Sequence, residues 1–513
     1  MDDAVAKLKY AYESVPYPHK YYPQTQLDRI AVTAILAGIA PADPEKSCVL
    51  EIGCGSGGNL LAMGEQFPQS QFLGIDLSPR QIDLGTNFLR EIGLANIELR
   101  CQDILDFPRD VGKFDFIIAH GVYSWVPAVV RDKLLAICRD HLSPGGLAFV
   151  SLNTYPGWKL REPVRDLMLF HNRGGDESIH MVQRGRQILQ MMAEHTPNVG
   201  TYREALRSGY RGLQKVTDDS IRHDHLESVN EPCYFRQFAG ELAAHGLSYV
   251  GDSSTDIDLW TKISPAVRET IFQLAPDSLD REQYLDFLVG RTFRRTVLRR
   301  SEETQPADRS EDLLRQVYVT ANFSEEPANA DPEGNPGFRF KGGAQELLIS
   351  DHRPLAVLRR IRSAWPMPVP FSELLQTYRN QLTPPIDERQ IFKDVELMVR
   401  TYFGFRLIEV LSQPSAVMSP SAGQFPRVSK YARWAATRGF SIPSLRHRPV
   451  DLDDSLRRLI PLLDGSRDRK AIAEEIIRGG NTVWPDKNPG ELDALIENAL
   501  GKLAEMQLLM KPI

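Results

Sequence analysis

Cysteine is scarce in this sequence, and no two cysteines have the spacing of a metal-binding pair. The 513 residues include five cysteines, an odd number, and none of them forms a C-x-x-C motif. A disulfide scaffold and a zinc ribbon are therefore excluded. We expect no metal site: the string HDH at 223–225 offers suitable residue types, but no further ligand cluster lies near it in the sequence.

Long apolar runs are also missing. The longest uncharged apolar stretches, at 30–42 and 116–130, contain 13 and 15 residues. A helix that spans a bilayer needs about 20 residues. No basic segment followed by an apolar one opens the sequence, so we expect a cytoplasmic protein that is not embedded in a membrane.

Neither sign of charge dominates the chain. Lys and Arg number 61 and Asp and Glu number 67, which gives a formal net charge of −6. This balance does not indicate nucleic-acid binding. The arginine-rich segment 291–300 is interleaved with apolar residues, and this pattern favours the solvated face of a strand. The length and the 42% hydrophobic content indicate a globular protein with several domains.

The first third of the chain alternates between short apolar strands and amphipathic helices. Strands are predicted at 47–52, 71–75, 97–101, 114–119 and 147–152, and helices at 27–45, 59–67, 79–92 and 128–141. Strands that alternate with helices at this pace form a mostly parallel sheet with helical crossovers. The sequence therefore predicts an α/β fold with a Rossmann-like sheet.

The remainder of the chain divides into further segments. A helical pattern without strand signals begins at 159, and strand signals return at 246–251 and 291–300. Two helix–helix–helix–strand segments near the C-terminus predict winged-helix-like modules. We expect a core at 1–158, a helical insertion at 159–230, the remainder of the core at 231–300, a polar linker at 301–345, a middle module at 346–411 and a C-terminal module at 412–513. Because the linker is polar, we expect a chain that ends near residue 300 to fold and to keep its ligand site.

A glycine-rich turn directly after the first predicted strand is the strongest motif. It reads E-x-G-x-G-x-G-G from Glu51 to Gly58, and Asp76 ends the second strand 25 residues after Glu51. Glycines let a backbone approach a ligand closely, and a carboxylate at a strand end suits ribose hydroxyls. A dinucleotide fingerprint would read G-x-G-x-x-G. The acid before the turn instead favours a cationic ligand, and the whole pattern resembles class I S-adenosylmethionine-dependent methyltransferases.

The resemblance extends over most of the chain. Strings such as HGVYSWVP at 120–127, NTYPGW at 153–158, EPCYF at 231–235 and LRHRPV at 445–450 are similar to those of bacterial methyltransferases with a methyltransferase regulatory domain. Some members of that group are protein-lysine methyltransferases that act on outer-membrane proteins, and they contain a core, a dimerising insertion, a middle and a C-terminal domain. The group usually continues PQT with His-Pro, whereas this chain has Gln26-Leu27.

The resemblance implies S-adenosylmethionine as the cofactor and a role for each matching residue. Glu51, Gly53, Gly55 and Gly57 would hold its methionine part, Asp76 its ribose hydroxyls, Leu77, Asp103 and Ile104 its adenine, and His120 would border its sulfonium. The insertion at 159–211 would form a homodimer.

Four residues are candidates for the chemistry of transfer. His120 ends the fourth strand, and it is either in contact with the ligands or a hydrogen-bonded structural residue. Tyr123 and Tyr155 follow two strands, and we favour a cage for a cation over a core aromatic cluster. Asn153 closes the fifth strand, where its amide could accept a hydrogen bond from an amine or cap the following turn.

Three functions stay open from the sequence. The first is methylation of lysine side chains in a protein substrate, which the resemblance favours. The second is methylation of a small molecule, with the C-terminal region regulatory. The third is a non-catalytic cofactor-binding assembly protein, against which the intact acidic and glycine motif argues.

Overall fold

The computed structural model describes most of the chain. The described residues are 17–173, 180–197, 199–253, 260, 263–302, 310–329, 336–342, 345–382, 387–480, 483–484 and 489–512. Within them, no helix is both long and apolar enough to cross a membrane.

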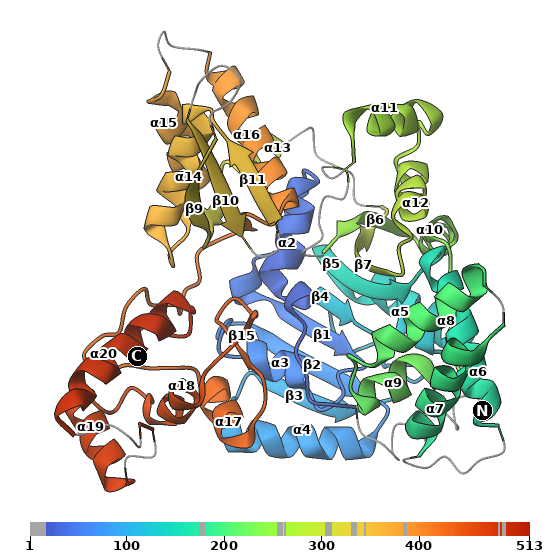
Figure 1. Ribbon diagram of the computed structural model, residues 1–513, viewed down its shortest axis with the longest axis horizontal. Coiled ribbons are helices and arrows are strands. Elements are labelled where there is room, and N and C mark those ends of the chain that lie inside the picture. The colour runs from blue at the N-terminus through green and yellow to red at the C-terminus, as the bar shows by residue number, and fades with distance from the viewer. Residues whose placement is uncertain are drawn as a thin grey trace.

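A seven-stranded sheet forms the centre of the core (Figure 1). Its strands are β1 (Cys48–Ile52), β2 (Gln71–Asp76), β3 (Ile97–Cys101), β4 (Phe114–Ala119), β5 (Leu142–Asn153), β6 (Leu247–Asp252) and β7 (Phe293–Arg300). The order is β3-β2-β1-β4-β5-β7-β6. Strands β1 to β5 are parallel, and β7 is antiparallel to β5 and β6. The Rossmann-like sheet and its two late strands are thus confirmed, and the order reverses beside β1, where ligands bind in such sheets.

Alternate residues of the strands face two separate apolar cores. Val49 and Ile118 pack on one side with α2 (Leu27–Leu36), α3 (Gly58–Met63) and α4 (Pro79–Ile92). Leu50 and Ile117 pack on the other side with α5 (Ala128–His141) and α10 (Phe235–Ala244). Because both faces are covered, the strands read as nearly continuous apolar runs.

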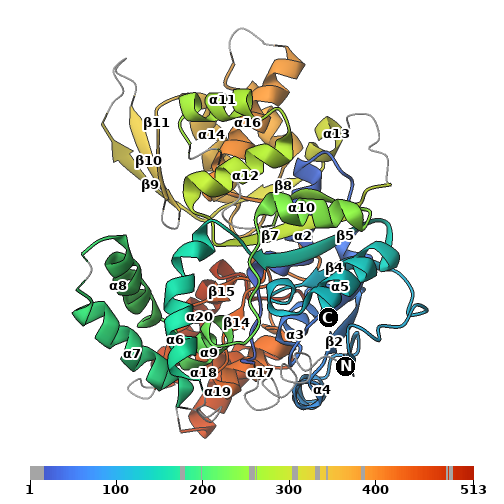
Figure 2. The same cartoon turned by 90° about the vertical axis from the view of Figure 1, so that its right-hand side faces the viewer.

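The helical insertion forms a bundle with its own apolar core, beside the sheet (Figure 2). Its helices are α6 (Glu162–His171), α7 (Met181–His195), α8 (Thr201–Leu213) and α9 (Asp218–His225). Met168, Leu189 and Leu206 are fully buried in that core. Helices α11 (Pro265–Leu274) and α12 (Ser278–Val289) then lead to β7.

The prediction of a polar linker at 301–345 is wrong for the residues of this segment that the structure describes. It contains α13 (Ser310–Leu314), β8 (Tyr318–Thr320), β9 (Ser324–Ala328), β10 (Gly337–Gly342) and the start of β11 (Gln345–Ile349). Strand β8 pairs with β12 (Val369–Pro370) and β13 (Glu409–Leu411), so the middle module begins before residue 346. Val317, Val319 and Phe323 are buried against α14 (His352–Ala364), α15 (Phe371–Arg379) and α16 (Glu388–Gly404), and these few apolar residues outweigh the polar composition.

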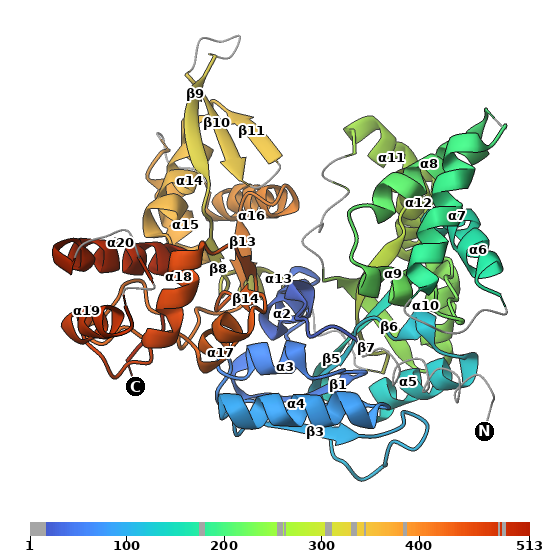
Figure 3. The ribbon, with the colours of Figure 1, turned by 60° about the horizontal axis from the view of Figure 1, so that its bottom comes forward.

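The C-terminal module packs directly on the core. It contains α17 (Lys430–Arg438), β14 (Ile442–Pro443), β15 (Pro449–Val450), α18 (Asp454–Leu459), α19 (Arg469–Arg478) and α20 (Leu492–Glu505), and α17 lies against α3 and α4 (Figure 3). The ring of Trp434 is 4.8 Å from that of Phe88, and its indole nitrogen donates to Glu91 over 2.8 Å. The core and this module therefore share one apolar cluster, which contradicts the basis for expecting an independent core at 1–300.

We predict that Trp434→Ala lowers the free energy of unfolding by about 3 kcal/mol, because it leaves a cavity between α4 and α17. Urea unfolding followed by far-ultraviolet circular dichroism measures this loss. Phe425→Ala is the control, because Phe425 is 44% exposed in the same module and its loss should cost less than about 0.5 kcal/mol. Equal effects of the two substitutions would contradict the shared cluster.

Candidate active site

A cavity of about 1250 Å³ opens at the carboxyl ends of β1, β2 and β4. Its walls come from three parts of the chain: the strand ends and turns of the core, the arm at 17–25 that precedes α2, and the insertion helices α8 and α9. Among the described residues, no group of three or more His, Cys, Asp or Glu could hold a metal ion.

The glycine-rich turn after β1 forms one side of the cavity. Its backbone has positive φ at Gly53 (71°), Gly55 (54°) and Gly57 (70°), a conformation that favours glycine. A Cβ on Gly55 would meet nothing within 4 Å, so this position faces open space. A Cβ on Gly57 would approach the Leu99 side chain to 3.1 Å, and Gly57 does not line the cavity. Gly57 therefore contributes to the shape of the turn and to its packing against Leu99, and it does not face the cavity.

Asp76 fixes the turn to the end of β2. Its Oδ2 accepts a hydrogen bond from the backbone N–H of Gly55 (2.8 Å), and its Oδ1 accepts one from Ser78 (2.9 Å). Leu77, Asp103 and Ile104 line the cavity beyond it. Asp103 also accepts from the backbone of Leu105 over 2.9 Å, which orients its carboxylate.

Glu51, near the end of β1, is a buried carboxylate with only 3% of its surface exposed, and it lines the cavity. Its Oε1 accepts a hydrogen bond from Asn59 Nδ2 (2.8 Å), whereas its Oε2 has no hydrogen-bond partner among the described residues. Burial raises the pKa of Glu51 to about 8, although the Asn59 hydrogen bond opposes this shift. A buried carboxylate with an unpaired oxygen beside a cavity suits a cationic ligand.

His120 lies between Glu51 and the insertion, at the end of β4. Its Nε2 accepts from the Gln24 amide (3.3 Å), and its Nδ1 lies 3.0 Å from Ser151 Oγ. Burial and the nearby Arg295 lower the pKa of His120 to about 3. The imidazole is therefore neutral near pH 7, with its one proton on Nδ1, and it is too weak a base to take up a second proton there.

Asn153 also reaches the cavity, from the end of β5. Its Nδ2 donates to Asn230 Oδ1 (2.8 Å), and its backbone N–H donates to Ser124 Oγ (2.8 Å). Both contacts hold the amide in place at the rim of the cavity.

The predicted cage of Tyr123 and Tyr155 is not found. Tyr123 turns its ring against Phe238 of α10, at 5.1 Å, and donates to Glu241, while Tyr155 donates to Glu162. Neither lines the cavity. Both follow strands as predicted, but the turns after the strands direct their side chains to other elements. Trp125 and Trp158, whose ring centroids are 6.3 Å apart, line the cavity instead.

The arm and α9 supply residues that the sequence did not single out for the site. Tyr22 lies with its ring 4.1 Å from that of His120. Burial, the neighbouring Tyr17, and the carboxylates of Glu51 and Asp224 raise the pKa of Tyr22 well above its ordinary value. Tyr22 also lines the cavity. The density of tyrosines and prolines before α2 is the sequence signal that could have identified it.

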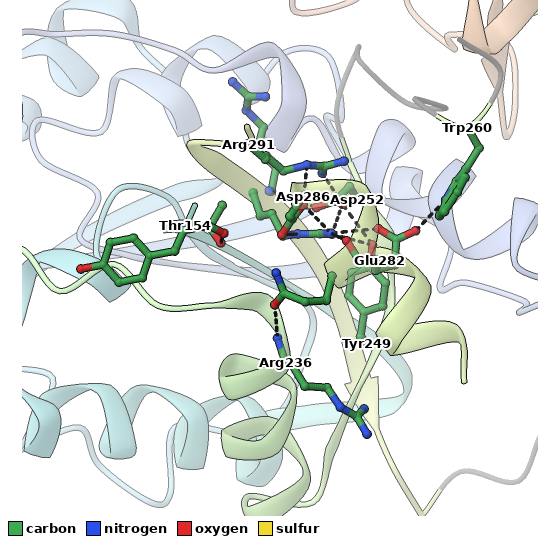
Figure 4. A network of polar contacts seen from close by, with 12 residues as sticks. Thr154, Arg236, Tyr249, Asp252, Trp260, Glu282, Asp286 and Arg291 are labelled. Carbon is green, nitrogen blue, oxygen red and sulfur yellow. Dashed lines mark hydrogen bonds and ion pairs between the residues drawn. The ribbon is translucent and has the colours of Figure 1, made fainter. Parts of the chain in front are cut away.

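The arginines of β7 point to opposite sides of the sheet. Arg295 lines the cavity. Arg294 is fully buried behind it, where it forms ion pairs with Asp252 (2.6 Å), Glu282 (2.9 Å) and Asp286 (2.9 Å). Figure 4 labels these three carboxylates, which lie close together. The expected solvated arginine face is therefore wrong at Arg294, because α12 covers that side and supplies two of the three carboxylates. This network fixes the strand behind the cavity.

Three family models match the chain. They are a methyltransferase domain at 49–146, a predicted methyltransferase regulatory domain at 217–300 and a PKMT C-terminal winged helix domain at 425–508. The first contains the turn, Asp76 and His120, and the second contains α9 and the two late strands.

Relatives match over nearly the whole length. The uncharacterized protein RP789 of Rickettsia prowazekii is 30% identical over 477 residues, which cover 91% of this chain and 85% of that protein. The structure of PKMT2 from Rickettsia typhi in complex with AdoHcy is 26% identical, with a TM-score of 0.81 over 96% of this chain and 100% of that one. A second structure of PKMT2 gives a TM-score of 0.82.

The acid-bordered glycine turn, the cavity at the switch point of the sheet and the full-length matches agree. The chain belongs to the family of class I S-adenosylmethionine-dependent methyltransferases that carry a methyltransferase regulatory domain and a PKMT-type C-terminal winged helix domain.

Proposed function

We propose that this enzyme transfers methyl groups from S-adenosylmethionine to lysine side chains of a protein. PKMT abbreviates protein-lysine methyltransferase, and the likeness to PKMT2 covers the insertion and the C-terminal modules as well as the core. The observation that carries the proposal is that the cavity continues from Glu51 to the Asp224 carboxylate on α9. The Asp224 carboxylate would face an amine-bearing acceptor there, beside Lys20 and Arg161 of the same wall.

The cofactor belongs at the end of the cavity formed by β1, β2 and β3. The unpaired Glu51 Oε2 would receive the α-ammonium group, and Asp76 would receive the ribose hydroxyls. Gly53 and Gly55 would allow close approach of the methionine part, and Leu77, Asp103 and Ile104 would enclose the adenine. The bound cofactor supplies a methyl group on a sulfonium cation.

The acceptor lysine belongs at the end of the cavity formed by the arm and α9. A free lysine with a pKa near 10.4 must lose its proton before it attacks, at a cost of about 4.6 kcal/mol at pH 7. Burial among Tyr22, Trp125 and Trp158 would reduce this cost by disfavouring the ammonium. Asn153 and Tyr22 would orient the amine, and water would accept its proton, since His120 is too weak a base.

Assembly and location are part of the proposal. Phe170, Met191 and Tyr202 on the insertion helices are 61%, 45% and 47% exposed. An isologous pairing of these faces would bury them in a homodimer. We propose a cytoplasmic enzyme whose substrate is a protein such as an outer-membrane protein before its export.

Cofactor affinity should rise with pH between 6 and 7.5. Below its pKa of about 8, Glu51 is protonated in the free enzyme, so a cationic ligand must displace that proton, at up to about a tenfold change in affinity per pH unit. Calorimetry with S-adenosylhomocysteine in buffers of different ionisation enthalpy should detect the released proton. Glu51→Gln should bind weakly and without this pH dependence; a flat profile in the wild type would contradict the role of Glu51.

Labelled methyl transfer tests the acceptor class. Purified enzyme and S-adenosylmethionine with an isotopic methyl group are added to a lysate, and mass spectrometry locates the label. We expect it on lysines of protein. Asp224→Asn should raise KM for the protein acceptor about tenfold, with cofactor affinity changed by less than about twofold, because a charge-assisted hydrogen bond to the amine is lost. Label on small metabolites alone would replace the proposal by the small-molecule alternative.

A further inference from the structure

A hairpin loop of the C-terminal module enters the methyltransferase core. Residues 444–448 connect β14 to β15 and contain the LRHR string. Ser444, Leu445, Arg446 and His447 are each buried, and His447 is 0% exposed. The φ of His447 is 58°, in the left-handed region that residues with a Cβ adopt uncommonly. The loop is therefore packed inside the protein and does not lie on its surface.

That place is the back of the Glu51 site. His447 Nε2 lies 2.9 Å from Asn59 Oδ1, and Asn59 Nδ2 donates to Glu51 Oε1 over 2.8 Å. Asn59 Oδ1 also accepts from the backbone N–H of Tyr22 (3.1 Å). Thr25 Oγ1 lies 3.0 Å from the same oxygen and 2.8 Å from the Tyr22 carbonyl oxygen, so these two acceptors share its one proton. One buried amide thus joins the core, the arm and the C-terminal module.

The directions of these hydrogen bonds follow from their chemistry. A backbone N–H can only donate, so the Asn59 atom facing Tyr22 is its oxygen, and its NH₂ must face Glu51. Because the Asn59 oxygen can only accept, His447 Nε2 must carry the proton of their hydrogen bond. His447 Nδ1 then accepts from Gln66 Nε2 (3.2 Å), whose second hydrogen goes to the Ala62 carbonyl oxygen (2.8 Å). A neutral imidazole satisfies every contact, and burial lowers the pKa of His447 to about 3.

The same module also holds the arm that lies over the glycine turn. Tyr431 of α17 has its hydroxyl 3.2 Å from His19 Nε2, and His19 Nδ1 lies 2.9 Å from Ser56 Oγ. Tyr21 of the arm pairs with Ser441 over 3.0 Å. Lys20 and Tyr22, the neighbours of these residues, line the cavity.

We propose that His447 is a positioning residue of the cofactor site. It fixes Asn59, which in turn holds Glu51 with its Oε2 free for the α-ammonium group of the cofactor. The C-terminal module is then a structural part of cofactor binding and not only a docking module for the acceptor. This inference rests on the proposed role of Glu51.

The test compares two ligands that differ in the amino-acid group. S-adenosylhomocysteine carries the α-ammonium that Glu51 would bind, and 5′-methylthioadenosine lacks it. In the full chain, His447→Phe keeps a ring but removes the donor, and should weaken S-adenosylhomocysteine about fivefold or more while leaving 5′-methylthioadenosine within about twofold. His447→Gln, which keeps an N–H donor, should restore most of the affinity. Arg448→Ala, in the same loop but outside these contacts with Asn59, is the control and should bind both ligands as the wild type does.

A double-mutant cycle separates positioning from folding. If His447 acts through Glu51, His447→Phe should have no further effect in the Glu51→Gln background. Equal losses for both ligands, or no loss for either, would overturn the inference. A Glu51→Gln variant that binds S-adenosylhomocysteine like the wild type would instead overturn the proposed role of Glu51 itself.

Discussion

A carboxyl group that is buried beside an apolar sheet needs hydrogen-bond donors in place of water, and Glu51 receives one from the side-chain amide of Asn59. Asn59 donates to the carboxylate and accepts from the Tyr22 backbone and His447. An unsatisfied group at any of these buried positions would cost roughly 1–3 kcal/mol. The arm, the core and the C-terminal module are therefore held in one arrangement by the need to satisfy a single polar cluster, and the cavity takes its shape from that arrangement.

Shared apolar packing gives a second reason to expect that a chain ending at residue 300 does not fold on its own. The apolar cluster of α3 and α4 continues into α17 through Phe88 and Trp434. Helix α2 is buried on two sides: Ile30 packs towards the sheet, and Val32 and Ile35 pack with the middle module. If these modules bind the proposed protein substrate, they can also influence the reacting end, because they share its supporting contacts.

Local sequence patterns predicted the sheet and most of the cofactor side of the cavity. Glu51, the turn glycines and Asp76 lie within 26 residues of one another, and the strand-end rule brings such residues together. Tyr22, Asp224 and His447 come from segments that meet only in the folded chain, and no local pattern could place them. The rule also could not tell which way a side chain turns after its strand, so Tyr123 and Tyr155 were assigned to the cavity although Trp125 and Trp158 line it. At 317–323 the polar composition of the surrounding segment concealed alternate apolar residues that are buried in the middle module, where Tyr318–Thr320 pairs as a strand.

Hydrogen–deuterium exchange with and without S-adenosylhomocysteine tests most directly whether the three parts of the chain form one cofactor site. The account predicts slower exchange on binding in three separate segments: the turn at 53–59, the arm at 17–25, which includes the Tyr22 amide that donates to Asn59, and the loop at 444–448. Protection confined to the turn and the ends of β2 and β3, with unchanged exchange in the arm and the loop, would contradict it.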